Sequence, residues 1–239
     1  MNGSDKNSYE NFENRKKDHI RLALNNRTQG LVPSGFSKIK LIHQALPEFN
    51  FSDVSLKVKL LGHDFSSPQF VSSMTAGHEN SFKINLNLAK AATKNNWLMA
   101  VGSQRRELSD EKASLEWKQI KAEVQGLNLI SNIGILEVLS YSAYDILKIV
   151  NNLEAIGLFI HLNPLQELFQ NNQDINFSGA LLAIENLVKQ SPVPILIKEV
   201  GFGINKELCH KLFQIGVKVV DMSGHGGTHW AQIEALRQS

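Results

Sequence analysis

Along most of the chain, short apolar runs alternate with longer stretches in which apolar residues recur every three or four positions. After Pro68 six strand-like runs follow one another, each with a polar loop after it, and a helical stretch follows each of the first five loops. The predicted strands span residues 70–74, 97–101, 128–132, 157–162, 194–197 and 217–220. The predicted helices span residues 85–95, 112–124, 143–154, 178–189 and 205–215. Such a succession predicts a parallel sheet covered by helices.

A polar side chain stands at or just after the end of every predicted strand. These residues are Thr75, Ser103, Asn132, His161, Lys198 and Ser223. A closed barrel gathers strand ends around one mouth, whereas an open sheet spreads them along an edge. The recurrence therefore favours an α/β fold of the TIM (β/α)₈ type, of which the chain supplies six of the eight units.

Two smaller elements are predicted before the barrel. Residues 15–24 carry the apolar spacing of a short helix with a basic first turn. Alternating apolar residues over 54–60, followed by a turn at 62–64, predict a hairpin. Residues 1–14 are polar with charges of both signs, which is unlike a signal peptide. We expect them to form a disordered lead-in and residues 15–239 to form one barrel domain.

Composition narrows the class of protein. The 239 residues are 42% hydrophobic and 20% charged, which is ordinary for a soluble globular chain. A net charge of +2 is too balanced to indicate a nucleic-acid partner. The single cysteine, Cys209, excludes an internal disulfide and favours a reducing, cytoplasmic location. No apolar run approaches the roughly 18 residues of a membrane span.

The richest polar cluster follows the fourth predicted strand. Pro164 should end the strand and turn the chain outward. His161, Asn163, Gln166 and Glu167 then leave the carboxyl end of that strand, which is where parallel α/β proteins carry their active sites. One such residue would most simply satisfy its own turn, but four together favour a functional site.

Other candidates are ambiguous when taken alone. Lys198 fits a Schiff-base lysine, a partner for Glu199, or a cation held against an electron-rich cofactor. The stretch Gly226–Thr228 fits a phosphate-cradling or ring-supporting loop, although a tight turn is its commoner meaning. Arg15 and Lys16 oppose the helix dipole, which suggests either an anionic ligand or simple solvation, and the residues alone favour solvation.

Taken together, these motifs resemble type 2 isopentenyl-diphosphate isomerase, the flavin-dependent family. The motifs run in the family's order, and those around His161 and Lys198 are the most specific. They are Arg15–His19, Met74–Gly77, Ala100–Arg105, His161–Glu167, Ile197–Gly203 and Ser223–Trp230. One departure is Ala76, which stands where the family usually has a second glycine.

The resemblance implies a flavin-binding barrel that interconverts isopentenyl and dimethylallyl diphosphate with reduced FMN, Mg²⁺ and NAD(P)H as reductant. It implies FMN contacts from Ser73, Met74, Thr75, Ser103, Asn132, Lys198, Ser223 and Thr228. It implies substrate contacts from Arg15, Lys16, His19, Arg105 and Gln166. Gln166 would act beside the allylic carbons, with His161 and Asn163 as positioning groups, and Glu167 would hold Mg²⁺. The basic first turn would then offset a diphosphate.

Two other interpretations remain open at this point. One is an FMN-dependent 2-hydroxy-acid oxidase on a similar barrel, although that chemistry would require an Arg/His pair for a carboxylate substrate. The other is a truncated, non-enzymatic fragment, because the family continues for two β/α units beyond the equivalent of Ser239. We expect a chain lacking those units to be a poor enzyme with open strand edges, and the full-length form to be a homo-oligomer.

Overall fold

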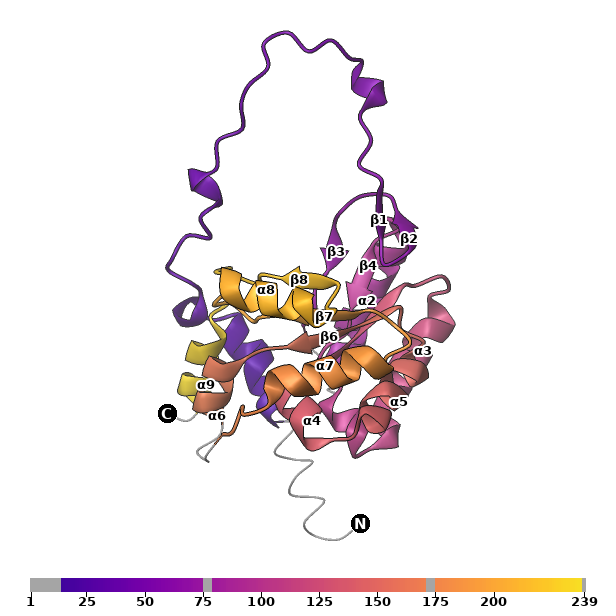
Figure 1. Cartoon of the computed structure of the whole chain (residues 1–239), viewed down its shortest axis with the longest axis vertical. Helices are drawn as coiled ribbons and strands as arrows, with labels where there is room; N and C mark the ends of the chain where they lie inside the picture. The colour runs from indigo at the N-terminus through magenta and orange to yellow at the C-terminus, as the bar shows by residue number, and fades with distance from the viewer. Residues whose placement is uncertain (1–13, 75–78, 171–174, 238–239) are drawn as a thin grey trace.

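Six parallel strands form the centre of the molecule. The computed structural model describes residues 14–74, 79–170 and 175–237 (Figure 1). The strands are β3 (Phe70–Val71), β4 (Leu98–Ala100), β5 (Leu129–Gly134), β6 (Gly157–His161), β7 (Ile195–Lys198) and β8 (Val219–Asp221). Each pairs in parallel with the next along the chain, and the sheet curls into a half-barrel. This confirms the predicted fold class.

Helices flank this sheet: most cover its outer face, whereas α6 and α9 lie together at the cavity (Figure 1). They are α2 (Glu79–Lys94), α3 (Leu115–Glu123), α4 (Ile135–Ser140), α5 (Ala143–Leu153), α6 (Pro164–Gln170), α7 (Ala180–Gln190), α8 (Lys206–Gln214) and α9 (Trp230–Arg237). Side-chain caps fix two of the starts: Ser142 accepts a hydrogen bond from the amide of Asp145, and Asn205 accepts one from that of Leu208. A further helix, over residues 14–23, is called here the N-terminal helix. No helix in the described ranges has the length and apolar character to cross a bilayer.

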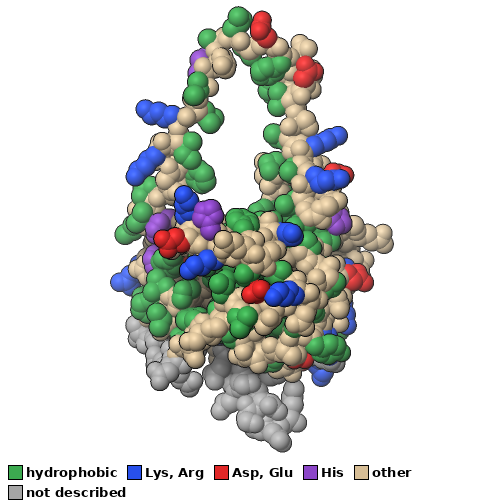
Figure 2. Space-filling view, viewed as in Figure 1, with side chains coloured by type: hydrophobic (Ala, Val, Ile, Leu, Met, Phe, Trp, Pro, Cys, Tyr) green, Lys and Arg blue, Asp and Glu red, His purple; other side chains and the backbone are tan. Residues whose placement is uncertain are grey.

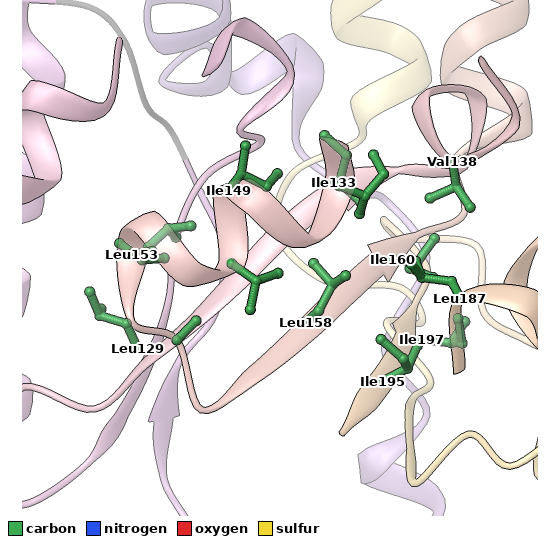
Figure 3. Close-up of a cluster of buried hydrophobic side chains, with 14 of the residues drawn as sticks. Leu129, Ile133, Val138, Ile149, Leu153, Leu158, Ile160, Leu187, Ile195 and Ile197 are labelled. Carbon is green, nitrogen blue, oxygen red and sulfur yellow. The ribbon is translucent and has the colours of Figure 1, made fainter. Parts of the chain in front are cut away.

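The strands bury both of their faces because successive side chains point to opposite sides. On the outer side, Leu158 and Ile160 of β6 and Ile195 and Ile197 of β7 pack in the same cluster as helix residues such as Leu187 (Figure 3). On the inner side, a second cluster joins Phe65, Leu98, Ala100, Ile130, Phe159 and Leu196. Two apolar layers therefore hold the sheet between them.

The inner face changes from apolar to polar along each central strand. Two residues after Ile130, Phe159 and Leu196 come Asn132, His161 and Lys198, on the same side of the sheet. At the amino-terminal end, the antiparallel hairpin of β1 (Val58–Leu60) and β2 (His63–Phe65) adds Phe65 to the inner cluster. The hairpin closes one end of the half-barrel, so a polar mouth is left at the other.

Several element boundaries differ from those predicted. The hairpin is confirmed, but its first strand begins at Val58, since Val54 and Leu56 are more than half exposed. The strand ends before Pro164, as predicted, with His161 as its last residue, and Pro164 itself begins α6, because proline lacks only an N–H that the first helical turn leaves unpaired. Helices α4, α6 and α9 were not predicted. The segment predicted as a helix over 112–124 starts as the 3₁₀ helix η5 (Glu111–Ser114) before α3.

A long segment, residues 30–57, arches away from the body between the N-terminal helix and the hairpin (Figure 1). It contains the 3₁₀ helices η2 (Phe36–Lys38) and η3 (Phe51–Asp53), whereas η1 (Asn26–Thr28) precedes it and η4 (Arg105–Leu108) lies in the loop after β4. Its apolar side chains face solvent, among them Leu31, Leu41, Ile42 and Phe51 (Figure 2). The arch contributes no residue to either buried cluster.

Candidate active site

The carboxyl ends of the strands open into a cavity of about 460 Å³. All the predicted site residues that the structure describes line it. They are Arg15, Lys16, His19, Ser73, Met74, Ser103, Arg105, Asn132, His161, Asn163, Gln166, Glu167, Lys198, Ser223 and Thr228. Thr75 lies outside the described residues. The fold thus brings segments from residue 15 to residue 228 to one place, while the role of each residue stays a prediction.

His161 is held at the floor of this cavity by the neighbouring strand. Its Nδ1 atom lies 3.0 Å from Oδ1 of Asn132, and it pairs in register with Lys198 of β7. Burial lowers the pKa of His161 well below 6.5, and the charges of Lys198, Arg105 and Lys16 lower it further. The imidazole is therefore neutral at physiological pH.

Asn132 is in turn clamped by Gln104, a buried residue of the loop after β4. The amide of Gln104 donates to the carbonyl of Asn132 at 2.9 Å, and its side-chain Oε1 accepts from the amide of Asn132 at 3.1 Å. The same Oε1 accepts from the hydroxyl of Ser131. Gln104 thereby continues the ladder between β4 and β5 beyond the last paired residues of β4.

The first turn of α6 groups the polar residues that follow His161. Residues spaced by three or four share one side of a helical turn. Accordingly, Nδ2 of Asn163 donates to Oε1 of Glu167 at 3.0 Å and lies 3.3 Å from Oε1 of Gln166. Glu167 is only 1% exposed, so its charge is stabilised by partners rather than by water.

Arg105 supplies a counter-charge to Glu167. Its Nη2 donates to Oε1 of Glu167 at 3.1 Å, while its Nε pairs with Oε1 of Glu137 on α4. Burial acts to lower the pKa of Arg105, but the charges of Glu137 and Glu167 outweigh burial and raise it. Arg105 is a fixed cation at this side of the cavity.

The N-terminal helix closes another side with a cationic turn. Arg15 and Lys16 line the cavity, and both lie close enough to Arg105 for its charge to lower their pKa values. Burial is the larger cause, and together these effects bring the pKa of Lys16 down to about 8. Lys16 is only 9% exposed, so solvation does not account for this basic side chain.

Glu234, on α9, contacts both His19 of the N-terminal helix and Gln166 of α6. Its Oε1 lies 2.8 Å from Nε2 of His19 and accepts from Nε2 of Gln166 at 3.1 Å, while Nη1 of Arg237 donates to its Oε2 at 2.5 Å. Burial alone would raise the pKa of Glu234, but these contacts lower it to about 2. Trp230 packs edge-to-face on His19, with ring centroids 5.3 Å apart.

The loop after β7 is shaped by Glu199. Its Oε2 accepts the backbone N–H groups of Gly201, Phe202 and Gly203 at 2.7, 2.5 and 3.2 Å. This carboxylate is thus committed to the loop rather than to its neighbour Lys198. Burial lowers the pKa of Lys198, although Asp221 and Glu199 act to raise it.

The Gly-Gly-Thr loop lies against the chain that leaves the N-terminal helix. The amide of Gly30 donates to the carbonyl of Gly227 at 2.6 Å, and Thr228 forms a bridge with Gln29. A Cβ added to Gly30 would lie only 2.7 Å from the carbonyl oxygen of Gly226, so this approach requires glycine. The loop is held as a wall of the cavity rather than being a free turn.

The sequence of the chain was compared with those of known proteins. No protein-family model matches the chain. The isopentenyl-diphosphate delta-isomerase of Legionella pneumophila strain Corby is 42% identical over 97% of this chain and 68% of its own length. The chain belongs to the isopentenyl-diphosphate delta-isomerase family. Enzymes of that name from Bdellovibrio bacteriovorus and Oceanobacillus iheyensis are 43% and 40% identical, with 66% and 64% of their lengths covered.

Solved structures share the fold of this isomerase-family chain at low sequence identity. A point variant of a mandelate oxidase with benzoyl-formic acid superposes with a TM-score of 0.56 at 12% identity, covering 91% of this chain and 68% of the oxidase. A soluble mutant of (S)-mandelate dehydrogenase from Pseudomonas putida gives 0.51 at 17% identity, covering 73% of this chain and 56% of the dehydrogenase. At such identities the likeness concerns the barrel fold alone.

The cavity of this isomerase-family chain has groups that suit a flavin and a divalent cation. Its volume is typical of small-molecule sites. Several buried polar atoms of the described residues have no hydrogen-bond partner within the protein, and Oγ of Ser73 and Oδ1 of Asn163, which belong to residues that line the cavity, are among them. The described residues contain no cluster of three His, Cys, Asp or Glu side chains. A hard cation at Glu167 would therefore complete its oxygen shell from a ligand and water.

Sequence reasoning missed four residues that build this site: Gln104, Glu137, Glu199 and Glu234. Gln104 and Glu199 lie inside motifs of the family resemblance; Gln104 received no role, and Glu199 was considered only as a partner for Lys198. Glu137 and Glu234 lie on α4 and α9, which were not predicted. A carboxylate on an unrecognised helix looks like surface charge in a sequence, so only the packing shows that both are buried.

Proposed function

We propose that the protein is a type 2, FMN-dependent isopentenyl-diphosphate delta-isomerase. It would interconvert isopentenyl and dimethylallyl diphosphate with reduced FMN and Mg²⁺, and NAD(P)H would reduce the flavin. The observation that carries this proposal is the cavity itself, which sets the cationic turn of the N-terminal helix against Glu167 and Arg105 and places Lys198 at a neighbouring strand end. The 42% identity to a named isomerase supports the same substrate class.

We assign the cationic side of the cavity to the diphosphate. Arg15, Lys16 and Arg105 offer guanidinium and ammonium donors, with His19 beside them on the same helix. Guanidinium groups bind phosphate oxygens through two parallel hydrogen bonds. Glu167 would hold Mg²⁺, which shares phosphate oxygens and neutralises charge that the side chains leave uncompensated.

The neutral polar groups are assigned to the alkene end of the substrate. Gln166 is fixed by Glu234 at one side and lies close to Asn163 at the other, so its amide has a defined orientation. His161 is neutral and hydrogen-bonded, which suits a positioning group better than an independent base. Moving a double bond adds a proton at one carbon and removes one at another, without net oxidation. None of these side chains needs to change its redox state.

The strand-end residues are assigned to the flavin. Ser73, Met74, Ser103, Asn132, Lys198, Ser223 and Thr228 line the cavity on successive segments, and Thr75 is expected to join them. When bound, reduced FMN would supply electron density and a proton beside the alkene. Of the three interpretations of Lys198, we favour the cation held against the reduced ring, because Glu199 is committed to its loop.

The 2-hydroxy-acid oxidase alternative is weaker. It rests on structures that are 11–17% identical to this chain, whereas the curated relatives with 38–43% identity are named isomerases. An oxidase would bind a carboxylate beside an Arg/His pair. Here the cavity sets three cationic side chains, Arg15, Lys16 and Arg105, beside Glu167, and this arrangement suits a diphosphate with a divalent cation better than a single carboxylate.

An anaerobic assay tests the proposal. The protein is incubated with FMN, Mg²⁺ and isopentenyl diphosphate, with or without dithionite, and dimethylallyl diphosphate is quantified. We expect product only with reduced flavin, and a loss of product when EDTA removes the metal. Reduction of the flavin by (S)-mandelate in place of isomerisation would instead support the oxidase alternative. As the single cysteine suggests, we place the enzyme in the cytoplasm.

A further inference from the structure

The guanidinium of Arg105 is divided between two buried carboxylates from different helices. Its Nε pairs with Oε1 of Glu137 on α4, and its Nη2 donates to Oε1 of Glu167 on α6 at 3.1 Å. Glu137 and Glu167 are 7% and 1% exposed. An arginine fork bonds a single carboxylate most strongly when two parallel N–H groups meet its two oxygens. Arg105 makes only half of that arrangement with each partner.

Because Arg105 contacts only Oε1 of Glu137, the second carboxylate oxygen, Oε2, receives no hydrogen bond from it. Oε2 of Glu137 is buried and has no hydrogen-bond partner among the described residues. A buried carboxylate oxygen without a donor is costly, so its persistence calls for an explanation. Oε2 of Glu137 lies beside Gly134. A Cβ atom at position 134 would overlap this oxygen, so the glycine leaves the space that the oxygen occupies.

We propose that Glu137 is a positioning residue that receives the whole Arg105 fork when Glu167 binds a divalent cation. Nη2 of Arg105 then moves from Oε1 of Glu167 to Oε2 of Glu137, which completes a two-bond fork with the Nε contact already present. This inference rests on the proposed role of Glu167 as the Mg²⁺ ligand. It adds the residue that releases Glu167 for that role.

Electrostatic repulsion favours the same exchange. Glu137 and Glu167 are both buried and both pair with Arg105, so a cation at Glu167 acts directly on the guanidinium between them. A divalent cation at Glu167 repels that guanidinium toward Glu137. Arg105 stays at the rim of the cavity after the exchange, because its Nε contact does not break. The cation and the arginine can then face the same diphosphate without competing for one carboxylate.

The test compares Mn²⁺ affinity in isosteric variants of the protein with oxidised flavin, so that no turnover intervenes. Electron paramagnetic resonance reports free Mn²⁺ during a titration. Glu137→Gln keeps one acceptor for Nε but presents an NH₂ group to Nη2, so the fork cannot close and Arg105 continues to compete for Glu167. We expect Mn²⁺ to bind about tenfold more weakly, the effect of one hydrogen bond to a charged group.

A second substitution separates this cause from a general loss of charge. In Glu137→Gln/Arg105→Gln no guanidinium remains to compete, and Mn²⁺ affinity should return to within about threefold of the wild type. Glu154→Gln, which removes an exposed carboxylate paired with Lys121, is the matched control and should leave Mn²⁺ binding unchanged. Wild-type affinity in Glu137→Gln, or no recovery in the double variant, would overturn the inference.

The proposed metal role can fail separately. If the wild type binds no Mn²⁺, or if Glu167→Gln binds Mn²⁺ as well as the wild type does, the assignment of the cation to Glu167 is wrong. A crystal structure of Glu167→Gln tests the exchange without any metal, because that variant removes the competing charge. We expect Nη2 of Arg105 within hydrogen-bond distance of Oε2 of Glu137. If that oxygen still lacks a donor in the variant, Glu137 does not receive the fork and the inference is contradicted.

Discussion

Nδ1 of His161 lies 3.0 Å from Oδ1 of Asn132, so the polar end of β6 is fixed by the polar end of β5. An amide oxygen only accepts hydrogen bonds, which places the proton on Nδ1 of the imidazole. The other ring nitrogen then carries a lone pair rather than a second proton. This pairing explains how a histidine between three cations is kept neutral and in one orientation.

The stability of the protein should therefore depend on pH through His161. Because its pKa is lowered in the folded protein, protons bind more readily to the unfolded chain below about pH 6.5. The contribution of His161 to the free energy of unfolding should be complete above that pH and should fall by about 1.4 kcal/mol by pH 5.5. Urea unfolding of the wild type and of His161→Gln from pH 8 to 5.5 measures it as the difference between the two profiles. Other groups cancel in that difference, among them Glu107, whose pKa burial raises to about 7 and which therefore favours folding as the pH falls. A difference that does not change with pH would contradict the assignment.

Glu234→Gln should impair both folding and turnover. The substitution removes the nearer of the two carboxylates that pair with Arg237, leaving only Asp18 at 3.9 Å, and it loosens the contacts of the buried Glu234 side chain to His19 and Gln166. We expect a loss of about 3–5 kcal/mol in the free energy of unfolding, as for other broken buried ion pairs. A misplaced Gln166 should also lower kcat about a hundredfold. Glu123→Gln, an exposed carboxylate near Lys90, should change neither quantity. Normal kcat in Glu234→Gln would show that Gln166 needs no such anchor.

Diphosphate affinity should weaken as the pH rises through about 8. Burial and the charges of Arg15 and Arg105 bring the pKa of Lys16 to about 8, so the free protein loses this charge within the range of an ordinary titration. Calorimetry with inorganic pyrophosphate between pH 7 and 9.5 follows the effect. In Lys16→Arg the charge persists, and the decline should move to higher pH. The protonation of pyrophosphate itself is the same in both experiments. If the wild type and Lys16→Arg gave the same dependence of affinity on pH, Lys16 would be excluded as the cause.

Glu199→Gln should loosen the wall of the cavity formed by residues 200–203. The carboxylate accepts three backbone N–H groups, and a neutral amide binds them less strongly. Hydrogen exchange at Gly201, Phe202 and Gly203 should accelerate about tenfold or more, with weaker FMN binding. Glu185→Gln on the exposed side of α7 serves as a control. If these three amides stayed as protected as in the wild type, Glu199 would not be what holds the loop.

The architecture could be predicted from the sequence because each central strand repeats one pattern. Apolar residues such as Ile130 and Phe159 are followed two positions later by Asn132 and His161, and a parallel barrel brings such positions together. The grouping of the polar strand ends in one cavity follows directly.

What the sequence could not supply were the contacts between elements. Glu137 and Glu234 look like ordinary helix-surface charges until α4 and α9 are packed against the mouth. Pro164 indicates that the strand ends before it, but a proline at this position fits either a loop or the first turn of a helix. The arch over residues 30–57 is apolar at many positions, yet these side chains are exposed, so its composition could not predict that it lies outside the core.

Isomerisation in D₂O followed by NMR tests the central claim most directly. The protein expressed from its own gene is combined anaerobically with Mg²⁺, isopentenyl diphosphate and FMN reduced by a measured amount of dithionite. The account predicts dimethylallyl diphosphate carrying solvent deuterium, with many turnovers per reduced flavin and no further reductant consumed. Absence of product with reduced flavin bound, or product formed equally well with oxidised flavin, would contradict it.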